Sequence, residues 1–553
     1  MTSSRPDDPI LFVNGSVYCP SDPFATSILV HGDTIAWIGE NGTEAAHAGG
    51  VSTVVDLEGA LVTPAFVDSH LHVTATGMVP LGVDLTHAPN LAAVLDAVAA
   101  RVAAHPGQPV VGFGWDERTW PEGRAPRQDE LDRAGAGLPV FLDRVDVHSS
   151  VVSGALVAAH PQLRTLAGFD PAGWLRAAAH DAARAAVYSD LPVDLRLIAQ
   201  RGTRQQAAAL GMCALHEMGG PDQAGAADLQ ALLALAATEP GPQVAGYWAQ
   251  WSDHVGDAES ERDQDSNGVR RALTLGAAGA AGAAGDIYLD GTIGSESAWL
   301  RAPYASGGIG DAYADASRVA AHVSACTEAG VQAGFHVIGD AALDAALDGF
   351  DIAAASLGAA RVRAMGHRLE HVELVHPDQI PRLAAHGIVV CAQPGFDQLW
   401  GGPESLYADR LGDRWRRMNP FADLVAGGVA LAFGSDAPVT PMGPWAAVRA
   451  AAFHHNPDQR LSVRAAFSAH TRGGWRAAGG HGGILAVGAP AHLAVWDVPE
   501  LVVQAPDARV AAWSTDPRSG TPGLPLLDPE VPLPTCLRTM VAGRTVHHLD
   551  AHG

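Results

Sequence analysis

The chain has 553 residues and a formal net charge of −25, and 47% of its residues are hydrophobic against 17% charged. At about 100–200 residues per domain, this length allows two to four domains, or one large barrel with an added module. The acidic balance is unfavourable for binding phosphate backbones or anionic lipid, so we expect neither nucleic acid nor a membrane as a partner. The sequence has no long apolar run and no signal-peptide pattern at its start, so we expect a cytoplasmic protein.

The cysteine and lysine content of the sequence limits the kinds of catalytic and metal-binding site that the chain can form. Cysteine occurs at widely spaced positions without CxxC pairs, which argues against both a disulfide framework and a cysteine-based zinc site. All 35 basic residues are arginine, because the sequence contains no lysine. This excludes Schiff-base catalysis, a phosphate-binding lysine of the Walker type and a carboxylated lysine that bridges two metal ions.

The two ends of the chain share a sequence pattern that is typical of short β-strands. Short β-branched runs with Gly and Asp turns open the sequence, as in ILFVNGSVY and SILVHGDTIAWIG, and similar runs return in HLAVWDV and TMVAGRTVHH. We therefore predict that residues 1–61 and 481–553 pair into one composite β-sandwich.

Between these ends, short apolar runs alternate with alanine-rich segments of helical length. The eight runs are LVTPAFVDSH, GMCALHEMG, VAGYWAQ, GDIYLDG, QAGFHVIGD, HRLEHVEL, IVVCAQP and VALAFGSD. This pattern predicts an α/β protein with a (β/α)8 TIM-like barrel over residues 62–480, in which catalytic groups lie where the strands meet their following loops. The low-complexity stretch LGAAGAAGAAG at 275–285 is interpreted as a flexible connector.

The first two runs are separated by about 140 residues. We predict a large insertion at about 84–210, which contains the further strand-like runs PVVGFGWDE and PVFLDRVDVH. An insertion of this kind projects over the catalytic face of a barrel as a lid or a pocket wall.

The first run ends in His70-Leu-His72. Residues i and i+2 of a strand point to the same side, so these two imidazoles can bind one ion between them. Later strand ends supply His336, His371 and Asp436. Neutral imidazoles and a carboxylate suit zinc, iron or manganese, and three or four protein ligands with an open position mark a catalytic site. We expect a divalent metal, with zinc favoured.

These residues also carry a resemblance to a known family. The HLH motif, the later histidines and the eighth-strand aspartate resemble the amidohydrolase superfamily. The segments GWDE, VDVHSS, LHEMG, DGTIGS, HVIGDAA, RLEHVE and FGSDAPV are similar to its YtcJ-like branch, which includes N-substituted formamide deformylase. The resemblance implies a barrel with a composite β-sandwich that hydrolyses carbon–nitrogen bonds of a small molecule.

The fourth run departs from that pattern. Many relatives carry a lysine there, in a pattern like KLFADG, whereas this chain has Asp286-Ile-Tyr-Leu-Asp290-Gly. Either Asp286 coordinates a metal ion directly or the site holds a single ion. One ion is favoured over two, with Asp286 as a ligand of the second, and Asp290 is expected to serve the following turn.

The expected mechanism uses an ion that activates water, because binding lowers the pKa of that water from 15.7 towards about 7. Asp436 would take the proton of the attacking water and pass it to the departing nitrogen. His371, where the metal leaves it free, would steady the carbonyl oxygen.

A second group of residues is expected to bind substrate. Trp115, Asp116, His148 and Glu217 lie in the motifs that match the family, and Arg368 offers a planar fork of donors for a ligand or a carboxylate. The alternative for Trp115 is packing inside the protein, and the alternative for His148 and Glu217 is an ordinary polar role.

Two other functions stay open on the sequence alone. One is a barrel that has lost turnover and serves as a binding or assembly subunit. The other keeps the metal but deaminates a heterocycle or hydrolyses an ester, because the ligands do not decide the reaction. A homodimer is an expected arrangement, since barrels of this size often pair.

Overall fold

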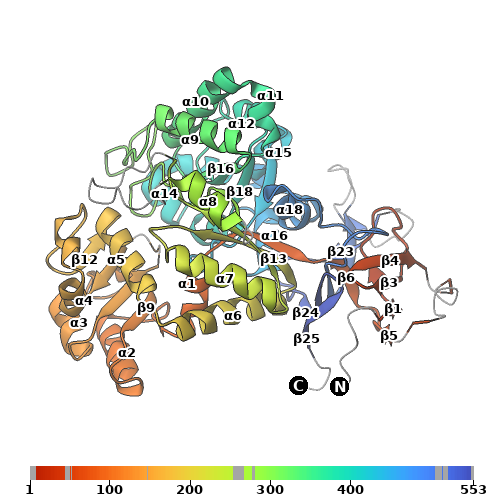
Figure 1. Ribbon diagram of the computed structural model, residues 1–553, viewed down its shortest axis with the longest axis horizontal. Helices are drawn as coiled ribbons and strands as arrows, with labels where there is room; N and C mark the ends of the chain where they lie inside the picture. The colour runs from red at the N-terminus through yellow and green to blue at the C-terminus, as the bar shows by residue number, and fades with distance from the viewer. Residues whose placement is uncertain are drawn as a thin grey trace.

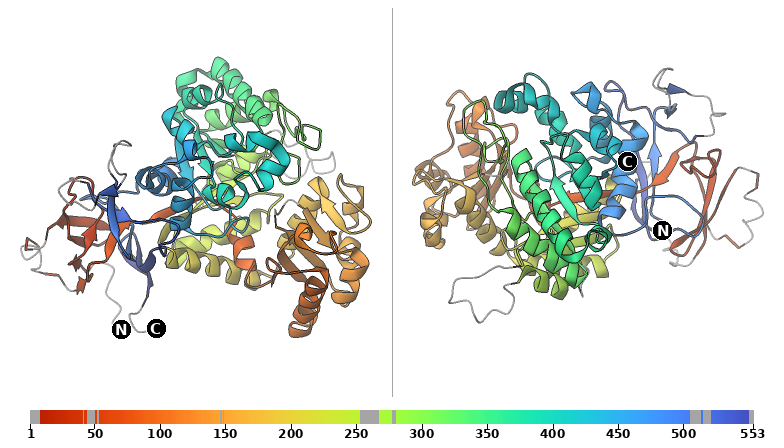
Figure 2. Two further views of the ribbon diagram at one scale, coloured as in Figure 1. Left: turned by 180° about the vertical axis from the view of Figure 1, so that it is seen from behind. Right: turned by 90° about the horizontal axis from the view of Figure 1, so that it is seen from above.

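The structure is a computed structural model, and it consists of a central barrel, an insertion module on one side and a β-sandwich on the other (Figure 1). The residues that it describes are 8–40, 42–43, 50–51, 53–145, 147, 149–252, 267–276, 280–504, 513–514 and 521–549. Figure 2 shows the same three parts from behind and from above, with the insertion module and the sandwich at opposite ends of the long axis.

The barrel is built from eight parallel strands. In hydrogen-bonding order they are β7 (Phe66–Leu71), β13 (Met212–Gly219), β14 (Gln243–Trp248), β15 (Ala280–Ala283), β16 (Gln332–Val337), β17 (Arg368–His371), β18 (Val389–Ala392) and β19 (Ala430–Phe433). The main helices around them are α6 (Val193–Ala209), α7 (Ala226–Thr238), α8 (Gly268–Gly276), α9 (Ala316–Ala329), α10 (Asp340–Leu357), α12 (Ile380–His386), α15 (Phe421–Ala426), α16 (Pro444–Ala452) and α17 (Val463–Ser468). The predicted (β/α)8 fold class is confirmed.

The fourth strand lies one segment earlier than predicted. It is β15, inside the alanine- and glycine-rich stretch interpreted as a flexible connector, and Asp286 follows it in a loop. The small residues have a packing reason: a Cβ added to Gly282 would lie 2.6 Å from the Gln332 carbonyl oxygen, and one added to Gly285 would lie 2.9 Å from Met218. A low-complexity run therefore forms a strand here, because its neighbours leave no room for larger side chains.

The insertion module has its own sheet and its own apolar core. Its strands, in sheet order, are β12 (Trp174–Arg176), β11 (Ser149–Val152), β10 (Val140–Arg144), β9 (Val110–Trp115) and β8 (Val83–Asp84), covered by α2 (Leu91–Ala104), α3 (Gln128–Ala134), α4 (Gly154–Ala159) and α5 (Ala177–Ser189). The sequence explains α2, because Asn90 caps its first turn and its buried residues Leu91, Val94 and Val98 recur at helical spacing. The last part of the expected insertion, α6, lies beside the barrel strand β13.

The sandwich combines both ends of the chain. One sheet contains β4 (Thr34–Gly39), β3 (Ser27–His31), β1 (Ile10–Val13) and β5 (Thr53–Asp56), and the other contains β2 (Ser16–Val17), β6 (Leu61–Pro64), β20 (Leu493–Asp497), β24 (Thr535–Val541) and β25 (Arg544–His548). The buried side chains between them include Phe12, Ile28, Leu493 and Met540. Since Ala65 alone separates β6 from β7, the sandwich is joined rigidly to the strand that carries His70.

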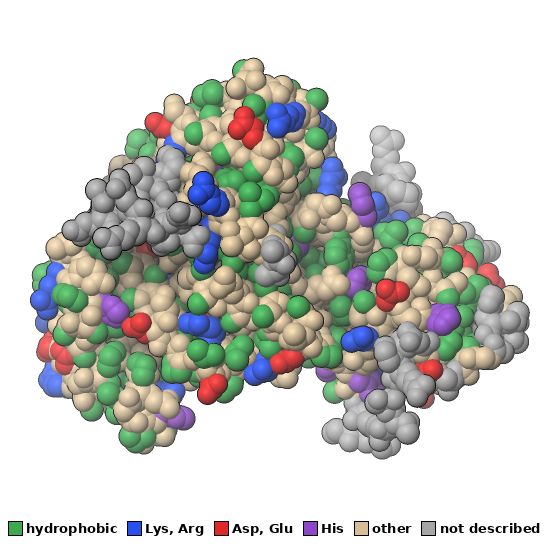
Figure 3. All heavy atoms as spheres, in the orientation of Figure 1, with side chains coloured by type: hydrophobic (Ala, Val, Ile, Leu, Met, Phe, Trp, Pro, Cys, Tyr) green, Lys and Arg blue, Asp and Glu red, His purple; other side chains and the backbone are tan. Residues whose placement is uncertain are grey.

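Two surface features bear on possible partners. None of the helices in the described part of the chain has the length and apolar composition needed to cross a bilayer. On the face drawn in Figure 3, acidic and basic side chains lie scattered among apolar and neutral ones.

Candidate metal centre and active site

Closure of the barrel brings the first and last strands together at the predicted metal ligands. The backbone N–H of Asp436 donates to the carbonyl oxygen of His70 over 2.7 Å, and that of His72 donates to the carbonyl oxygen of Ala437 over 2.9 Å. Below them, the Asp68 carboxylate accepts from the backbone N–H of Ser435 over 2.9 Å. These bonds hold Asp436 beside the two histidines, although the sequence separates them widely.

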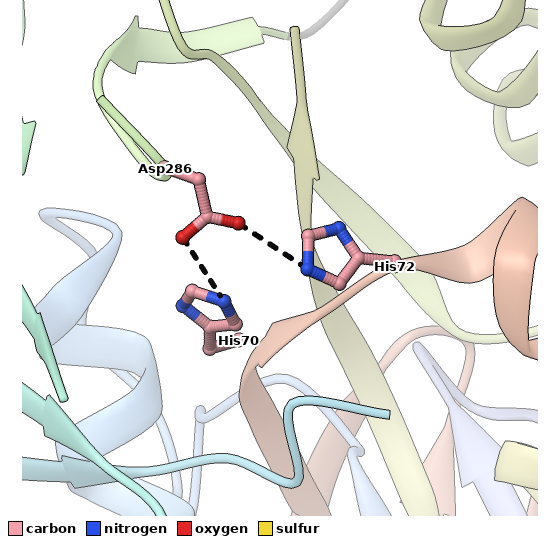
Figure 4. A group of neighbouring side chains, drawn as sticks. All are labelled: His70, His72 and Asp286. Atoms are coloured by element: carbon pink, nitrogen blue, oxygen red, sulfur yellow. Dashed lines mark ion pairs between the residues drawn. The ribbon is translucent and has the colours of Figure 1, made fainter. Parts of the chain in front are cut away.

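Asp286 and Asp436 lie against the HLH motif. The His72 Nε2 atom is 3.2 Å from Asp286 Oδ2 and 3.4 Å from Asp436 Oδ1, and the His70 Nε2 atom is 3.6 Å and 3.4 Å from the same two carboxylates. Figure 4 shows Asp286 reaching towards both imidazoles from the loop after β15.

A second histidine pair lies on the other side of Asp286. Its Oδ1 atom is 3.7 Å from His336 Nδ1 and 3.8 Å from His371 Nε2. His371 and Asp436 have φ angles of 70° and 54°, which side chains other than glycine adopt at a cost. The six side chains predicted as ligands, Asp286 included, therefore meet at the carboxyl end of the barrel.

The donor set fits a metal ion. The buried His70 Nε2 and Asp286 Oδ1 atoms have no hydrogen-bond partner within the described residues, although both face the cluster. Burial alone would raise the pKa of Asp286, but the surrounding imidazoles hold it well below its usual value. Burial would likewise lower the pKa of His72, and the Asp286 and Asp436 carboxylates instead raise it to about 9. Such protonated imidazoles exchange their protons for a cation when metal binds.

The spacing of these atoms bears on the number of ions. The ligand atoms that lie within 4.8 Å of one another form three overlapping groups, which are His70 with His72 and Asp286, His70 with His371 and Asp436, and Asp286 with His336 and His371. Each group contains two histidines. None of the three groups joins all four imidazoles, and Asp286 belongs to two of them, so it connects the pair His70 and His72 with the pair His336 and His371.

Buried neighbours fix the orientation of the imidazoles. The His70 Nδ1 atom lies 2.9 Å from Glu370 Oε2, and the His371 Nδ1 atom lies 2.8 Å from Gln393 Oε1, so both rings direct Nε2 into the cluster. His336 is turned the other way, with Nε2 3.2 Å from the Gly291 carbonyl oxygen and Nδ1 facing Asp286. Partners of this kind fix the tautomer and raise the basicity of a metal-binding histidine.

Arg368 does not reach the substrate side of the site. Its side chain is fully buried, donates to Glu370 over 2.5 Å and 2.9 Å and to the Ser69 carbonyl oxygen over 2.6 Å, and stacks on Tyr247. Arg368 therefore acts through Glu370 and His70 as a positioning residue. The prediction that it contacts a ligand was based on its donor fork, which is already used inside the barrel.

Replacing Arg368 with methionine is expected to destabilise the metal-free protein by about 3–5 kcal/mol, because Glu370 would keep a buried charge without its partner. The same change should weaken metal binding, since Glu370 would no longer hold His70 in place. Chemical denaturation and a competitive metal titration measure the two effects. As a control, Arg201→Met removes a surface pair with Glu239 and should leave the free energy of unfolding nearly unchanged, because water screens this pair. Equal stability of the two variants would contradict this role for Arg368.

Two pockets border the cluster. The first, here called the His72 pocket, lies between the barrel and α5 and is lined by His72, Thr74, Asp143, Arg184, Tyr188, Glu217 and Gln223, among others. The second, the His371 pocket, is lined by Ile293, His336, His371, Glu373, Phe396, Trp400, Tyr407 and Asp436, among others. Together they give a bound molecule two directions in which to extend from the cluster.

The remaining residues predicted to bind substrate lie in different places. Glu217 lines the His72 pocket, where burial raises the pKa of its carboxyl to about 7. Trp115 is buried in the core of the insertion module and donates its indole N–H to the Leu142 carbonyl oxygen over 2.9 Å, so it serves packing. Asp116 pairs with Arg118 and Arg144. His148 lies outside the described residues.

Comparison with known proteins agrees with this geometry. The amidohydrolase family matches residues 53–547. The chain belongs to the amidohydrolase family. Among the relatives of this amidohydrolase, the putative amidohydrolase YtcJ of Bacillus subtilis is 25% identical over 76% of this chain and 80% of its own length. The N-substituted formamide deformylase of Arthrobacter pascens is 24% identical over 77% of this chain and 80% of its own length. The predicted resemblance to the YtcJ-like branch is confirmed.

Solved structures support the fold of the amidohydrolase. An uncharacterized metal-dependent hydrolase from Pyrococcus furiosus superposes with a TM-score of 0.68 at 23% identity, and the match covers 88% of this chain and 98% of that one. A second one, from Pyrococcus horikoshii, has the same TM-score at 22% identity, with 89% and 97% covered. Since family membership rests on the sequence match, these structures add the architecture alone.

Sequence reasoning missed one residue that supports the amidohydrolase site. Gln393 holds His371, and it was overlooked because glutamine is not a usual metal ligand. Its position gave a signal, since it follows the seventh strand run as Asp436 follows the eighth. Asp290, which was predicted to serve the following turn, accepts instead from the backbone N–H groups of Trp299, Ile338 and Gly339 and so ties its loop to the end of β16.

Proposed function

We propose that this amidohydrolase uses a metal centre to hydrolyse the amide bond of a small molecule, such as an N-acyl or N-formyl amine, and not a peptide bond. The observation that carries the proposal is the buried meeting of four imidazoles with two carboxylates at the carboxyl end of the barrel, with Asp436 at the edge of a pocket. Zinc would suit this ligand set, with His70 and His72 available to hold one ion, His336 and His371 available to hold a second, and Asp286 within reach of both pairs. The sequence had favoured one ion, and the spacing of the groups supports two.

The metal, when bound, lowers the pKa of a water molecule and polarises the substrate carbonyl. Asp436 accepts the proton of the attacking water at its carboxylate oxygen and returns it to the departing nitrogen. His371 is held by Gln393 with its Nε2 atom towards the cluster, so it would serve there as a ligand, and the ion would stabilise the carbonyl oxygen on which charge develops.

The two pockets hold different halves of the substrate in this proposal. Because Asp436 protonates the departing nitrogen and lines the His371 pocket, the amine half occupies that pocket, against Phe396 and Trp400. The acyl half then extends past His72 into the pocket beside α5. An aromatic amine therefore suits the first pocket, since rings stack favourably on aromatic side chains.

The test is metal reconstitution followed by hydrolysis of a panel of formanilides, acetanilides and longer N-acyl anilines. We expect about two zinc ions per chain, release of aniline, loss of turnover on chelation and recovery when zinc is returned. Failure to bind zinc together with absence of turnover would favour a non-catalytic binding barrel. Bound metal with turnover of esters or heterocyclic amines alone would assign a different reaction to the same centre.

A further inference from the structure

The His72 pocket contains a buried arginine whose donors are poorly matched. Arg184, on α5, is 8% exposed. Its Nη1 and Nη2 atoms reach the Val147 carbonyl oxygen and the Tyr288 hydroxyl over 3.4 Å each, its nearest Asp181 oxygen lies at 3.8 Å, and its Nε atom has no partner within the described residues. These distances are at or beyond the long limit of a hydrogen bond.

The buried Arg368 of the same protein shows the usual arrangement, with three bonds of 2.9 Å or shorter. Buried donors are nearly always paired, because desolvation without a partner is costly. The donors of Arg184 are therefore available to a hydrogen-bond acceptor on a ligand.

Tyr188 adds a second, independent donor to the same pocket. It is 3% exposed, and its hydroxyl has no hydrogen-bond partner within the described part of the chain. Residues four apart on a helix lie on one face, so Arg184 and Tyr188 present their donors side by side. Both line the pocket that also contains the metal ligand His72.

The surrounding charges decide what kind of acceptor fits. Asp143, Glu217 and Asp228 also line the pocket, and Asp181 lies behind Arg184 on the same helix. Asp228 is offset by Arg196 at 3.1 Å. Glu217 carries only part of a charge at neutral pH, since its pKa is raised to about 7, but Asp143 and Asp181 already offset the single guanidinium. Arg184 therefore has no surplus positive charge for a further anion. A neutral acceptor takes the two donors without needing such a surplus.

We propose that Arg184 and Tyr188 form a subsite for a second, uncharged hydrogen-bond acceptor on the acyl half of the substrate, such as a ketone or a further amide carbonyl. The substrate is then a bifunctional N-acyl amine and not a simple formamide. This inference rests on the proposed function for the placement of the acyl half in the His72 pocket. It also assigns the insertion module a direct part in substrate choice, because α5 supplies both donors.

Three anilides of nearly equal shape test the subsite. Acetoacetanilide has a neutral ketone, malonanilic acid has a carboxylate in its place, and 3-methylbutananilide has an isopropyl group. Their affinities are measured by calorimetry on the zinc-loaded Asp436→Asn variant, so that binding is read without turnover. We expect acetoacetanilide to bind about tenfold or more tightly than either of the others, the effect of one good hydrogen bond.

Single substitutions test whether Arg184 and Tyr188 cause the difference in affinity between the anilides. Arg184→Met should bring the affinities of acetoacetanilide and 3-methylbutananilide within about twofold, Tyr188→Phe should narrow their ratio in part, and the exposed Arg201→Met should leave it unchanged. Tyr188→Phe keeps the test valid if Arg184→Met does not fold. Equal binding of all three anilides, or no binding of any, would overturn the subsite, and tightest binding of malonanilic acid would show a carboxylate site instead. Absence of anilide hydrolysis by the unaltered protein, with the affinity order intact, would instead count against the proposed function.

Discussion

The Asp436→Asn variant is expected to lose about 10²–10⁴-fold in kcat and to keep its metal, because proton transfer by a positioned side chain contributes a factor of this size. Asparagine retains an oxygen towards His70 and His72 but accepts no proton. The carboxylate is also prepared for this task, since it lies 3.4 Å from both Nε2 atoms and lines the pocket assigned to the departing amine.

Two measurements separate chemistry from metal loss in this variant. Metal content by elemental analysis should match the unaltered protein, while single-turnover release of aniline should be slow. The Asp458→Asn variant changes an exposed carboxylate away from the cluster and should have unaltered kinetics. Full turnover by Asp436→Asn would remove the proton-transfer role, and loss of all metal would make Asp436 chiefly a ligand.

Replacing Asp286 with alanine is expected to have the larger effect on metal binding. Its carboxylate is the only one in the described cluster that approaches all four imidazoles, with distances of 3.2–3.8 Å. Without it the two histidine pairs have no shared anion, so at least one ion should be lost and hydrolysis should fall to the background rate. The affinity should fall by more than the factor of about 10–100 that changes outside the coordinating residues produce.

The Glu370→Gln variant is the matched comparison, because Glu370 touches His70 but no other member of the cluster. Competition with a chromogenic chelator ranks the unaltered protein, Glu370→Gln and Asp286→Ala by zinc affinity. We expect the affinity to fall in that order. If Asp286→Ala bound zinc as well as Glu370→Gln does, Asp286 would not be a shared ligand.

Much of the barrel could be predicted because its strands are buried on both faces and appear as short apolar runs. The fourth strand could not be predicted, because β15 consists of alanine and glycine, which have no preference for strands. These small residues are needed because the neighbours of Gly282 and Gly285 leave no space for larger side chains. The pairing of the two chain ends in one sandwich was predicted from the strand-like sequence pattern that they share. Cross-sheet packing of Phe12 and Met540, by contrast, needed the coordinates.

The members of the cluster could be predicted from the sequence because each follows or ends a strand run, and the carboxyl ends of parallel strands meet at one end of a barrel. The direction in which individual side chains point could not be predicted. Arg368 and Glu370 point together into the barrel below the site, and the positive φ of His371 interrupts the alternation that would have turned its ring away. Trp115 was misplaced for a related reason, since a motif does not tell whether a strand-end aromatic faces a pocket or the core of its own module.

Anomalous diffraction at the zinc edge, from crystals of the metal-loaded protein, tests the account most directly. Two peaks should appear, one beside His70 and His72 and one beside His336 and His371, with the Asp286 carboxylate between them and all ligand distances near 2.0–2.2 Å. Zinc bound elsewhere, with these six side chains free of any peak, would contradict the catalytic centre.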